Sequence, residues 1–112
     1  MLSINGWVIR LTRGDTARMD INILNSDGTK YVLKSGDVVE FTVKQNVNSN
    51  IELIKKVGTE IVIEPQETSN LEYGKYMYDV QVTFADGSID TVIPPSPLII
   101  LEEVNYAINR SN

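Results

Sequence analysis

Apolar and polar residues alternate with a period of two along several stretches of the chain. The clearest stretch begins at residue 76, where every second position is aromatic or aliphatic and most positions between are polar. Successive side chains of a strand point to opposite faces, so this alternation predicts a half-buried strand of an antiparallel sheet. The residues expected to face the core together are Tyr76, Tyr78, Val80, Val82 and Phe84.

Similar runs recur at roughly ten-residue intervals, which is typical of a β-sandwich or barrel. The strands that they predict cover residues 6–12, 17–24, 38–44, 51–56, 60–64, 75–84, 89–93 and 98–104. Turn-forming segments such as Asn25-Ser26-Asp27-Gly28 and Ala85-Asp86-Gly87-Ser88 separate them. Residues 68–72 are expected to form one short helical turn. We therefore predict an all-β fold, namely an immunoglobulin-like antiparallel β-sandwich of seven to eight short strands.

The chain has 112 residues, a usual size for one domain, and shows no internal repeat or linker. We expect one domain over residues 1–104 and a polar tail over residues 105–112 that frays. The segment Pro94-Pro95-Ser96-Pro97 is expected to blunt a sheet edge or to carry the chain from one sheet to the other. The first six residues do not resemble a signal peptide, which predicts synthesis in the cytoplasm without a secretion signal.

The chain contains neither Cys nor His. This composition excludes disulfides, zinc–thiolate sites and the usual catalytic triads. The carboxylates are scattered and form no calcium-loop motif, so we expect no enzyme activity, no metal and no cofactor. The net charge of −5 argues against nucleic-acid binding. The longest aliphatic run, Leu98-Ile99-Ile100-Leu101, is too short to span a membrane.

Tyr76 and Tyr78 open the longest predicted strand, shortly after Pro65 ends an earlier one. This order is typical of a tyrosine corner, in which a Tyr hydroxyl bonds a nearby backbone group at the crossover between sheets. The alternative is that these tyrosines form an aromatic binding platform. Trp7, the only Trp, is expected to pack in the core, and its alternative role is to anchor a partner.

Charge is distributed unevenly between the two halves of the chain. Residues 1–56 carry 8 basic and 6 acidic side chains, whereas residues 57–112 carry 2 basic and 9 acidic ones. Unlike surfaces of neighbouring copies could therefore attract each other. The three early Arg residues also fit an anion site or a solvated strand edge. In addition, the run 98–101 is apolar at every position, so its second face needs a cover, from a partner or from the segment around Trp7.

These observations predict self-association or docking onto a larger ring. The candidate interface residues are Arg10, Arg13, Arg18, Ile99, Leu101, Glu102 and Glu103.

Several segments together resemble a known family. They are Gly14-Asp15-Thr16 before an alternating strand, residues 39–44, 61–63 and 71–82, and the closing Asp86-Gly87. In this order they are similar to the small immunoglobulin-like domains of tailed-phage and prophage particles. The similarity is greatest to the N-terminal domains of baseplate upper proteins in phages of Gram-positive hosts. In that family the domain attaches a longer fibre-like or receptor-binding protein to the tail, and it has no catalytic residues.

The resemblance implies a structural or assembly module of a phage tail or baseplate. Its implied partners are other phage structural proteins or copies of itself, and its implied location is the virion. Because the chain stops after one domain, we expect a stand-alone decoration or a small accessory tail protein. The alternative is a carbohydrate-binding or adhesive β-sandwich at a bacterial surface, which would need two or three aromatic side chains on one exposed face.

Overall fold

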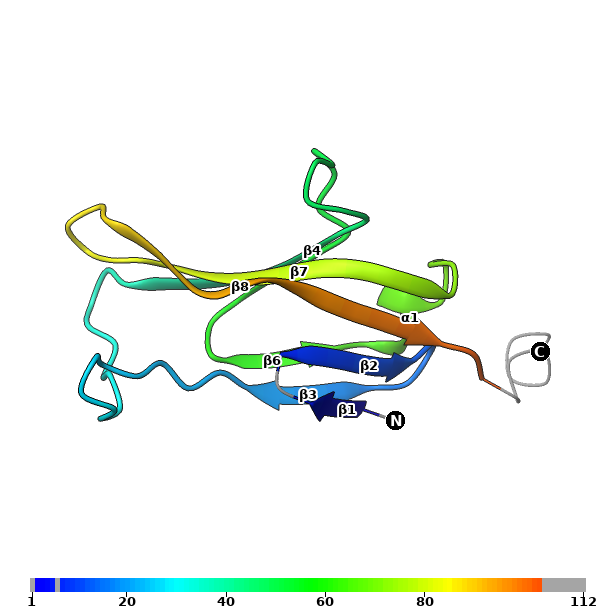
Figure 1. The fold of residues 1–112 in the computed structure, drawn as a ribbon, viewed down its shortest axis with the longest axis horizontal. Coiled ribbons are helices and arrows are strands. Elements are labelled where there is room, and N and C mark those ends of the chain that lie inside the picture. Colours follow the sequence, from blue (N-terminus) through cyan, green and yellow to red (C-terminus); the bar gives the residue numbers. More distant parts are fainter. Residues whose placement is uncertain (1, 6, 104–112) are drawn as a thin grey trace.

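The protein folds almost entirely into β-strands in the computed structural model, which describes residues 2–5 and 7–103 (Figure 1). The strands are β1 (Leu2–Asn5), β2 (Val8–Thr12), β3 (Ala17–Asp20), β4 (Val38–Lys44), β5 (Ile54–Val57), β6 (Glu60–Ile63), β7 (Gly74–Thr83) and β8 (Ile89–Leu101). One short helix, α1 (Pro65–Thr68), lies between β6 and β7. The all-β prediction is confirmed. The helical turn begins earlier than residues 68–72, because Pro65 and a capping box between Glu64 and Glu67 set its start.

The strands form two sheets. Six strands follow the order β1-β2-β8-β7-β4-β5, and β3 pairs with β6 in a small second sheet. In the view of Figure 1, β4 and β7 run above β3 and β6, and residues of both sheets share one hydrophobic core. β2 and β8 run parallel, with Ile9 opposite Leu98, so the predicted purely antiparallel arrangement is wrong at this pair. An alternating pattern specifies the face of each side chain but not the direction of the neighbouring strand.

The core takes the apolar side chains that the alternating runs provide. In β7, Tyr76, Tyr78, Val80 and Val82 are all buried, as predicted. Phe84 lies beyond the strand and is only partly buried, where its ring packs edge-on against that of Tyr31 with centroids 5.7 Å apart. The other buried apolar residues are Ile9, Leu11, Ala17, Ile23, Val39, Phe41, Val43, Ile54, Ile61, Ile63, Leu98 and Ile100.

β8 is one strand of 13 residues, where the sequence predicted two separate strands. The segment Pro94-Pro95-Ser96-Pro97 lies inside it. Pairing with β7 shifts register between Tyr78 and Gln81, and this irregularity lies beside Pro94 and Pro95. β2 pairs only with residues 98–101, so the prolines lie where β8 has a partner strand on one side. The segment therefore behaves as a sheet edge, as predicted, but it does not carry the chain between sheets.

Other expectations differ from the structure in smaller ways. β3 ends at Asp20 instead of residue 24, and residues 21–37 form a long connection that contains only the isolated bridge between Leu24 and Lys30. Trp7 was expected in the core, but 53% of it is exposed. The predicted tail over residues 105–112 lies outside the described residues. No helix in the described part of the chain has the length and apolar character needed to cross a membrane.

Candidate functional site

Two of the predicted interface residues, Arg13 and Glu103, meet at one end of the large sheet. Because β2 and β8 are parallel, the residues that follow them leave the sheet at the same edge, where Arg13 N–H donates a 2.9 Å hydrogen bond to the Leu101 carbonyl. The Arg13 guanidinium donates to Glu103 Oε1 over 3.1 Å, and these side chains are only 13% and 11% exposed. It also donates to the Leu71 carbonyl over 3.2 Å and to the Tyr73 hydroxyl over 2.7 Å. We call Arg13, Leu71, Tyr73 and Glu103 the Arg13 clamp.

The Arg13 clamp changes the interpretation of the uneven charge. The basic N-terminal part and the acidic C-terminal part were expected to make contacts between copies, but Arg13 and Glu103 form an ion pair within one chain. Attraction between copies therefore cannot depend on this pair. The second carboxylate oxygen, Glu103 Oε2, is buried and has no hydrogen-bond partner within the described residues.

The remaining candidate interface residues lie on different surfaces. Arg10 and Ile99 are register partners of β2 and β8 on the sheet face that points away from the core, and both are half-buried. Leu101 and Glu102, at the end of β8 and just after it, are exposed. Arg18 is exposed on β3, in the small sheet, so it does not join the others.

The two tyrosines of β7 make different hydrogen bonds. The Tyr76 hydroxyl donates to the Glu72 carbonyl, four residues upstream, over 2.7 Å, which is the bond that characterises a tyrosine corner. The Tyr78 hydroxyl donates instead to the Trp7 carbonyl over 2.5 Å and so ties β7 to the chain that enters β2. Burial raises the pKa of both Tyr76 and Tyr78, so each hydroxyl keeps its proton at neutral pH and acts as a donor.

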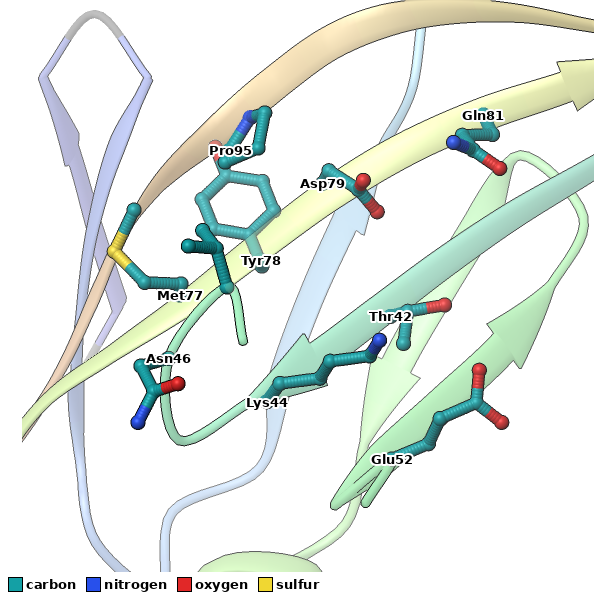
Figure 2. Close-up of a pocket in the computed structure, with 10 residues that line it drawn as sticks. Thr42, Lys44, Asn46, Glu52, Met77, Tyr78, Asp79, Gln81 and Pro95 are labelled. Atoms are coloured by element: carbon teal, nitrogen blue, oxygen red, sulfur yellow. The ribbon is translucent and has the colours of Figure 1, made fainter. Parts of the chain in front are cut away.

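A pocket of about 180 Å³ lies on the face of the large sheet that points away from the core (Figure 2). We call it the outer-face pocket. Thr42 and Lys44 of β4 and Asp79 and Gln81 of β7 line its floor. Thr42 and Asp79 are direct cross-strand partners, and Gln81 lies two residues further along β7. These side chains face outward because their neighbours along each strand, such as Val80, are buried in the core.

The loop between β4 and β5 supplies one wall of the outer-face pocket. Asn46 and Glu52 come from this loop, which rises above the sheet in Figure 1. The loop is held locally, since Asn46 Oδ1 accepts a 3.0 Å hydrogen bond from the Asn48 N–H. Apolar surface is provided by Met77 of β7 and Pro95 of β8, and Figure 2 shows these groups around the pocket.

Asp79 is the most unusual group in the outer-face pocket. Burial raises the pKa of its carboxyl group, and the nearby positive charge of Lys44 acts in the opposite direction without reversing the shift. Within the described residues, no side chain or backbone group donates a hydrogen bond to this carboxylate. The other acid, Glu52, pairs with Lys55 over 3.5 Å, and Lys55 also pairs with Glu40 over 3.0 Å.

Of the residues that line the outer-face pocket, only Tyr78 and Pro95 were named from the sequence, and both for structural roles; its polar residues were not expected to form a site. Asp79 belongs to the alternating run of β7 and was interpreted only as part of a solvated face. The signal that would have found it is the register between β4 and β7, which places Thr42 opposite Asp79. Register is a long-range property, and a single sequence without a connecting hairpin does not specify it.

The opposite end of the sheet from the Arg13 clamp is organised around Asp37. Its carboxylate accepts hydrogen bonds from the Tyr31 hydroxyl over 2.7 Å, the Lys34 N–H over 2.9 Å and the Ala85 N–H over 3.0 Å. These bonds, led by that from Lys34, lower the pKa of Asp37. They join the connection before β4 to the turn between β7 and β8, seen together at the left of Figure 1. We call residues 24–38 and 84–89 the hairpin end.

The hairpin end carries several exposed aliphatic side chains. They are Leu24, Val32, Leu33, Val38 and Ile89. Val38 and Ile89 both pair with Thr83 of β7, so they flank it on the outer face of the sheet, roughly 10 Å apart. The sequence predicted turns here but no surface of this kind.

Within the described residues, no group of three or more carboxylates is arranged to hold a metal ion. A scan against protein-family models found no matching family, and a search of curated proteins found no matching sequence. The class that the fold defines is therefore an all-β protein with two sheets around one core. Its distinguishing surface features are the outer-face pocket and the hairpin end.

Proposed function

We propose that this chain is a non-catalytic, immunoglobulin-like module of a phage tail or baseplate that acts through protein–protein contacts. The immunoglobulin-like assignment is supported by the division of strands between the sheets. β4, β7 and β8 would correspond to strands C, F and G, and β3 and β6 to strands B and E. The hydrogen bond from Tyr76 to the Glu72 carbonyl, at the start of β7, fits the same assignment.

The observation that carries the assembly function is the set of exposed aliphatic side chains at the hairpin end. The domain buries its core apolar residues thoroughly, yet Ile89 is 64% exposed on β8 and Val32 is 76% exposed in the nearby connection. The two segments that carry these side chains are joined by the hydrogen bond from the Ala85 N–H to Asp37, and covering exposed aliphatic side chains releases water from apolar area. Docking of this end onto another structural protein would cover them.

The carbohydrate-binding alternative is supported less well. Within the described residues, Trp7 and Tyr73 are the aromatic residues with substantial exposure. The Arg13 guanidinium lies 4.2 Å from the centroid of the Tyr73 ring, so one face of this ring is already occupied. A platform of two or three free aromatic rings for sugar stacking is therefore not supported.

The proposal is tested in phage particles from cells that encode the chain. Particles are released by prophage induction, purified to constant density and analysed by mass spectrometry and by immunogold electron microscopy. We expect the chain in the particles, with gold at the tail or baseplate. Recovery only from the soluble cell fraction, with none in the particles, would contradict the proposal.

A second arm tests the contact surface. Ile89→Thr combined with Val38→Thr should lower incorporation into particles at unchanged expression. Ile51→Thr is the matched control for Ile89, because Ile51 is 67% exposed and Ile89 64%, but Ile51 lies in the loop between β4 and β5. Equal incorporation of both variants would place the contact elsewhere on the molecule.

A further inference from the structure

Asp79 offers a hydrogen-bond acceptor that the described part of the chain does not use. Its carboxylate is half-buried on the outer face of the sheet, and no described residue donates a hydrogen bond to it. A carboxylate that is partly withdrawn from water is stabilised by any donor that reaches it, most of all by a charged one. The outer-face pocket is therefore suited to a ligand that brings N–H or O–H donors.

The charges around the pocket select among such ligands. Asp79 and Glu52 are acidic and Lys44 is basic, while Lys55 neutralises charge on Glu52 and Glu40. Taken together these five groups carry three negative charges and two positive ones, so a cation is favoured over an anion. Lys44 is not already the cationic partner of Asp79, because no ion pair between the two is found among the described contacts. The effect of burial on the pKa of Asp79 also exceeds the opposing effect of Lys44.

The walls of the pocket fit the rest of a basic side chain. Met77 and Pro95 provide apolar surface against which a three-carbon stem can pack. Thr42, Gln81 and Asn46, labelled in Figure 2, add a hydroxyl and two amide oxygens to the lining of the same pocket, although Asn46 Oδ1 also accepts from the Asn48 N–H. A guanidinium has five N–H donors in a planar fork that matches a carboxylate, and the remaining donors can reach these neighbours. The volume of about 180 Å³ accommodates one such side chain.

We propose that the outer-face pocket binds an arginine side chain of a partner protein, with Asp79 accepting the guanidinium. This inference rests on the proposed function, because it specifies the side chain through which an assembly partner docks. It places a specific contact on the sheet face between the Arg13 clamp and the hairpin end.

The experiment uses the whole chain and N-acetyl-arginine amide as the probe, followed by two-dimensional ¹H–¹⁵N NMR. We expect saturable shifts of the Asp79 and Gln81 amide signals, with a dissociation constant on the order of 1–10 mM, as befits a single side chain. Asp79→Asn should weaken binding by about tenfold or more, because the charged acceptor is lost. Asp90→Asn is the matched control, since Asp90 is an exposed acid of β8 outside the pocket, and it should bind like wild type.

Lys44→Met distinguishes a cationic ligand from the others. Removal of the competing ammonium should tighten arginine binding severalfold, whereas it would weaken binding of an anion or of a sugar that accepts from Lys44. The neutral isostere N-acetyl-citrulline amide should bind at least about tenfold more weakly than the arginine probe. Glucose, galactose and inorganic phosphate are titrated in parallel.

The inference is overturned if the arginine probe gives no saturable shift, if Asp79→Asn binds like wild type, or if a sugar or phosphate binds the pocket more tightly than arginine. Its failure is distinguishable from failure of the proposed function. Loss of arginine binding in a chain that is present in phage particles removes the pocket's role and leaves the assembly function intact. Arginine binding in a chain absent from the particles supports the pocket and contradicts the phage assignment.

Discussion

Each end of the large sheet is organised around one charged side chain, but the two ends differ in the apolar surface that they expose. At the Arg13 clamp, one guanidinium bonds three groups of its own chain, and the Gly14 N–H donates a 2.8 Å hydrogen bond to the hydroxyl of buried Thr68. At the hairpin end, polar bonding centres on Asp37, and the same segments carry exposed aliphatic side chains. Both ends are therefore held by hydrogen bonds within the chain, and the hairpin end differs in the number of aliphatic side chains that it leaves exposed.

β7 connects the two ends, and substitutions along it should show the difference. Tyr78→Ala removes a buried ring whose centroid lies 5.3 Å from that of Phe41. It also removes the hydrogen bond to the Trp7 carbonyl. We expect it to lower the free energy of unfolding by about 3 kcal/mol or more. Phe84 at the hairpin end is only partly buried, so Phe84→Ala should lower the free energy of unfolding by only about 1–2 kcal/mol. Urea melts measure the free energy of unfolding of both variants. A decrease of less than about 1 kcal/mol for Tyr78→Ala would mean that its ring does not pack in the core.

The second prediction separates the nearly buried ion pair of the clamp from an exposed one. Arg13→Met leaves the Glu103 carboxylate without its partner and should cost about 2–3 kcal/mol. Lys55→Met, which removes the exposed pair with Glu40, should lower the free energy of unfolding much less, because water screens this pair.

A double-mutant cycle tests the cause of this difference. Glu103→Gln added to Arg13→Met removes the stranded charge and should recover part of the stability. Equal costs for Arg13→Met and Lys55→Met in urea melts, or strict additivity in the cycle, would show that the clamp is not a coupled unit.

Local pattern predicted those features that depend on one strand at a time. The inward face of β7 follows from its alternation alone, and so does the outward position of Asp79. The bond from Tyr76 to Glu72 joins residues four apart, so it depends only on local sequence order, whereas the Tyr78 hydroxyl bonds the distant Trp7 carbonyl. Each of the local features needs no knowledge of which strands pair.

The features that the sequence did not predict depend on pairing between distant segments. Arg13 and Glu103 meet only because β2 and β8 run parallel, although the two residues are 90 positions apart. The outer-face pocket exists because Thr42 faces Asp79 across β4 and β7. The prolines at 94, 95 and 97 led to a prediction of two separate strands where β8 is continuous. A strand accepts proline where its N–H side has no partner strand, and the sequence does not show where that is.

The third prediction concerns pH at the hairpin end. Hydrogen bonds from the Lys34 N–H and the Tyr31 hydroxyl hold the pKa of Asp37 below its ordinary value of 3.8. A lowered folded-state pKa gives stability that is present above the unfolded pKa and is lost as pH falls through the folded one. Wild type should therefore exceed Asp37→Asn in stability at neutral pH, and the gap should close below about pH 4.

Thermal melts of wild type and Asp37→Asn from pH 7 to pH 2 measure this gap. The acids Asp27 and Asp86 also have lowered pKa values, because each accepts a side-chain hydrogen bond, from Thr29 and Ser88 respectively. Asp27 is present in both proteins, so its effect cancels in the difference. The charge of Asp37 slightly raises the pKa of Asp86, so Asp37→Asn changes the contribution of Asp86 by a small amount. A gap that stays constant to pH 2 would contradict the role of Asp37 as a charged acceptor.

The smallest expected effect on stability belongs to the aliphatic surface of the hairpin end. Ile89→Thr and Val38→Thr change exposed side chains, so each should alter the free energy of unfolding by no more than about 0.5 kcal/mol. Their effect should appear in association instead, because these side chains are the ones that a second copy could cover.

Static light scattering at tens of micromolar should show wild type above 12.5 kDa. The double variant should return to the monomer mass, and Ile51→Thr should behave as wild type. A wild-type mass of 12.5 kDa that does not change with protein or salt concentration would defeat self-association, and the hairpin end would then serve only a different partner.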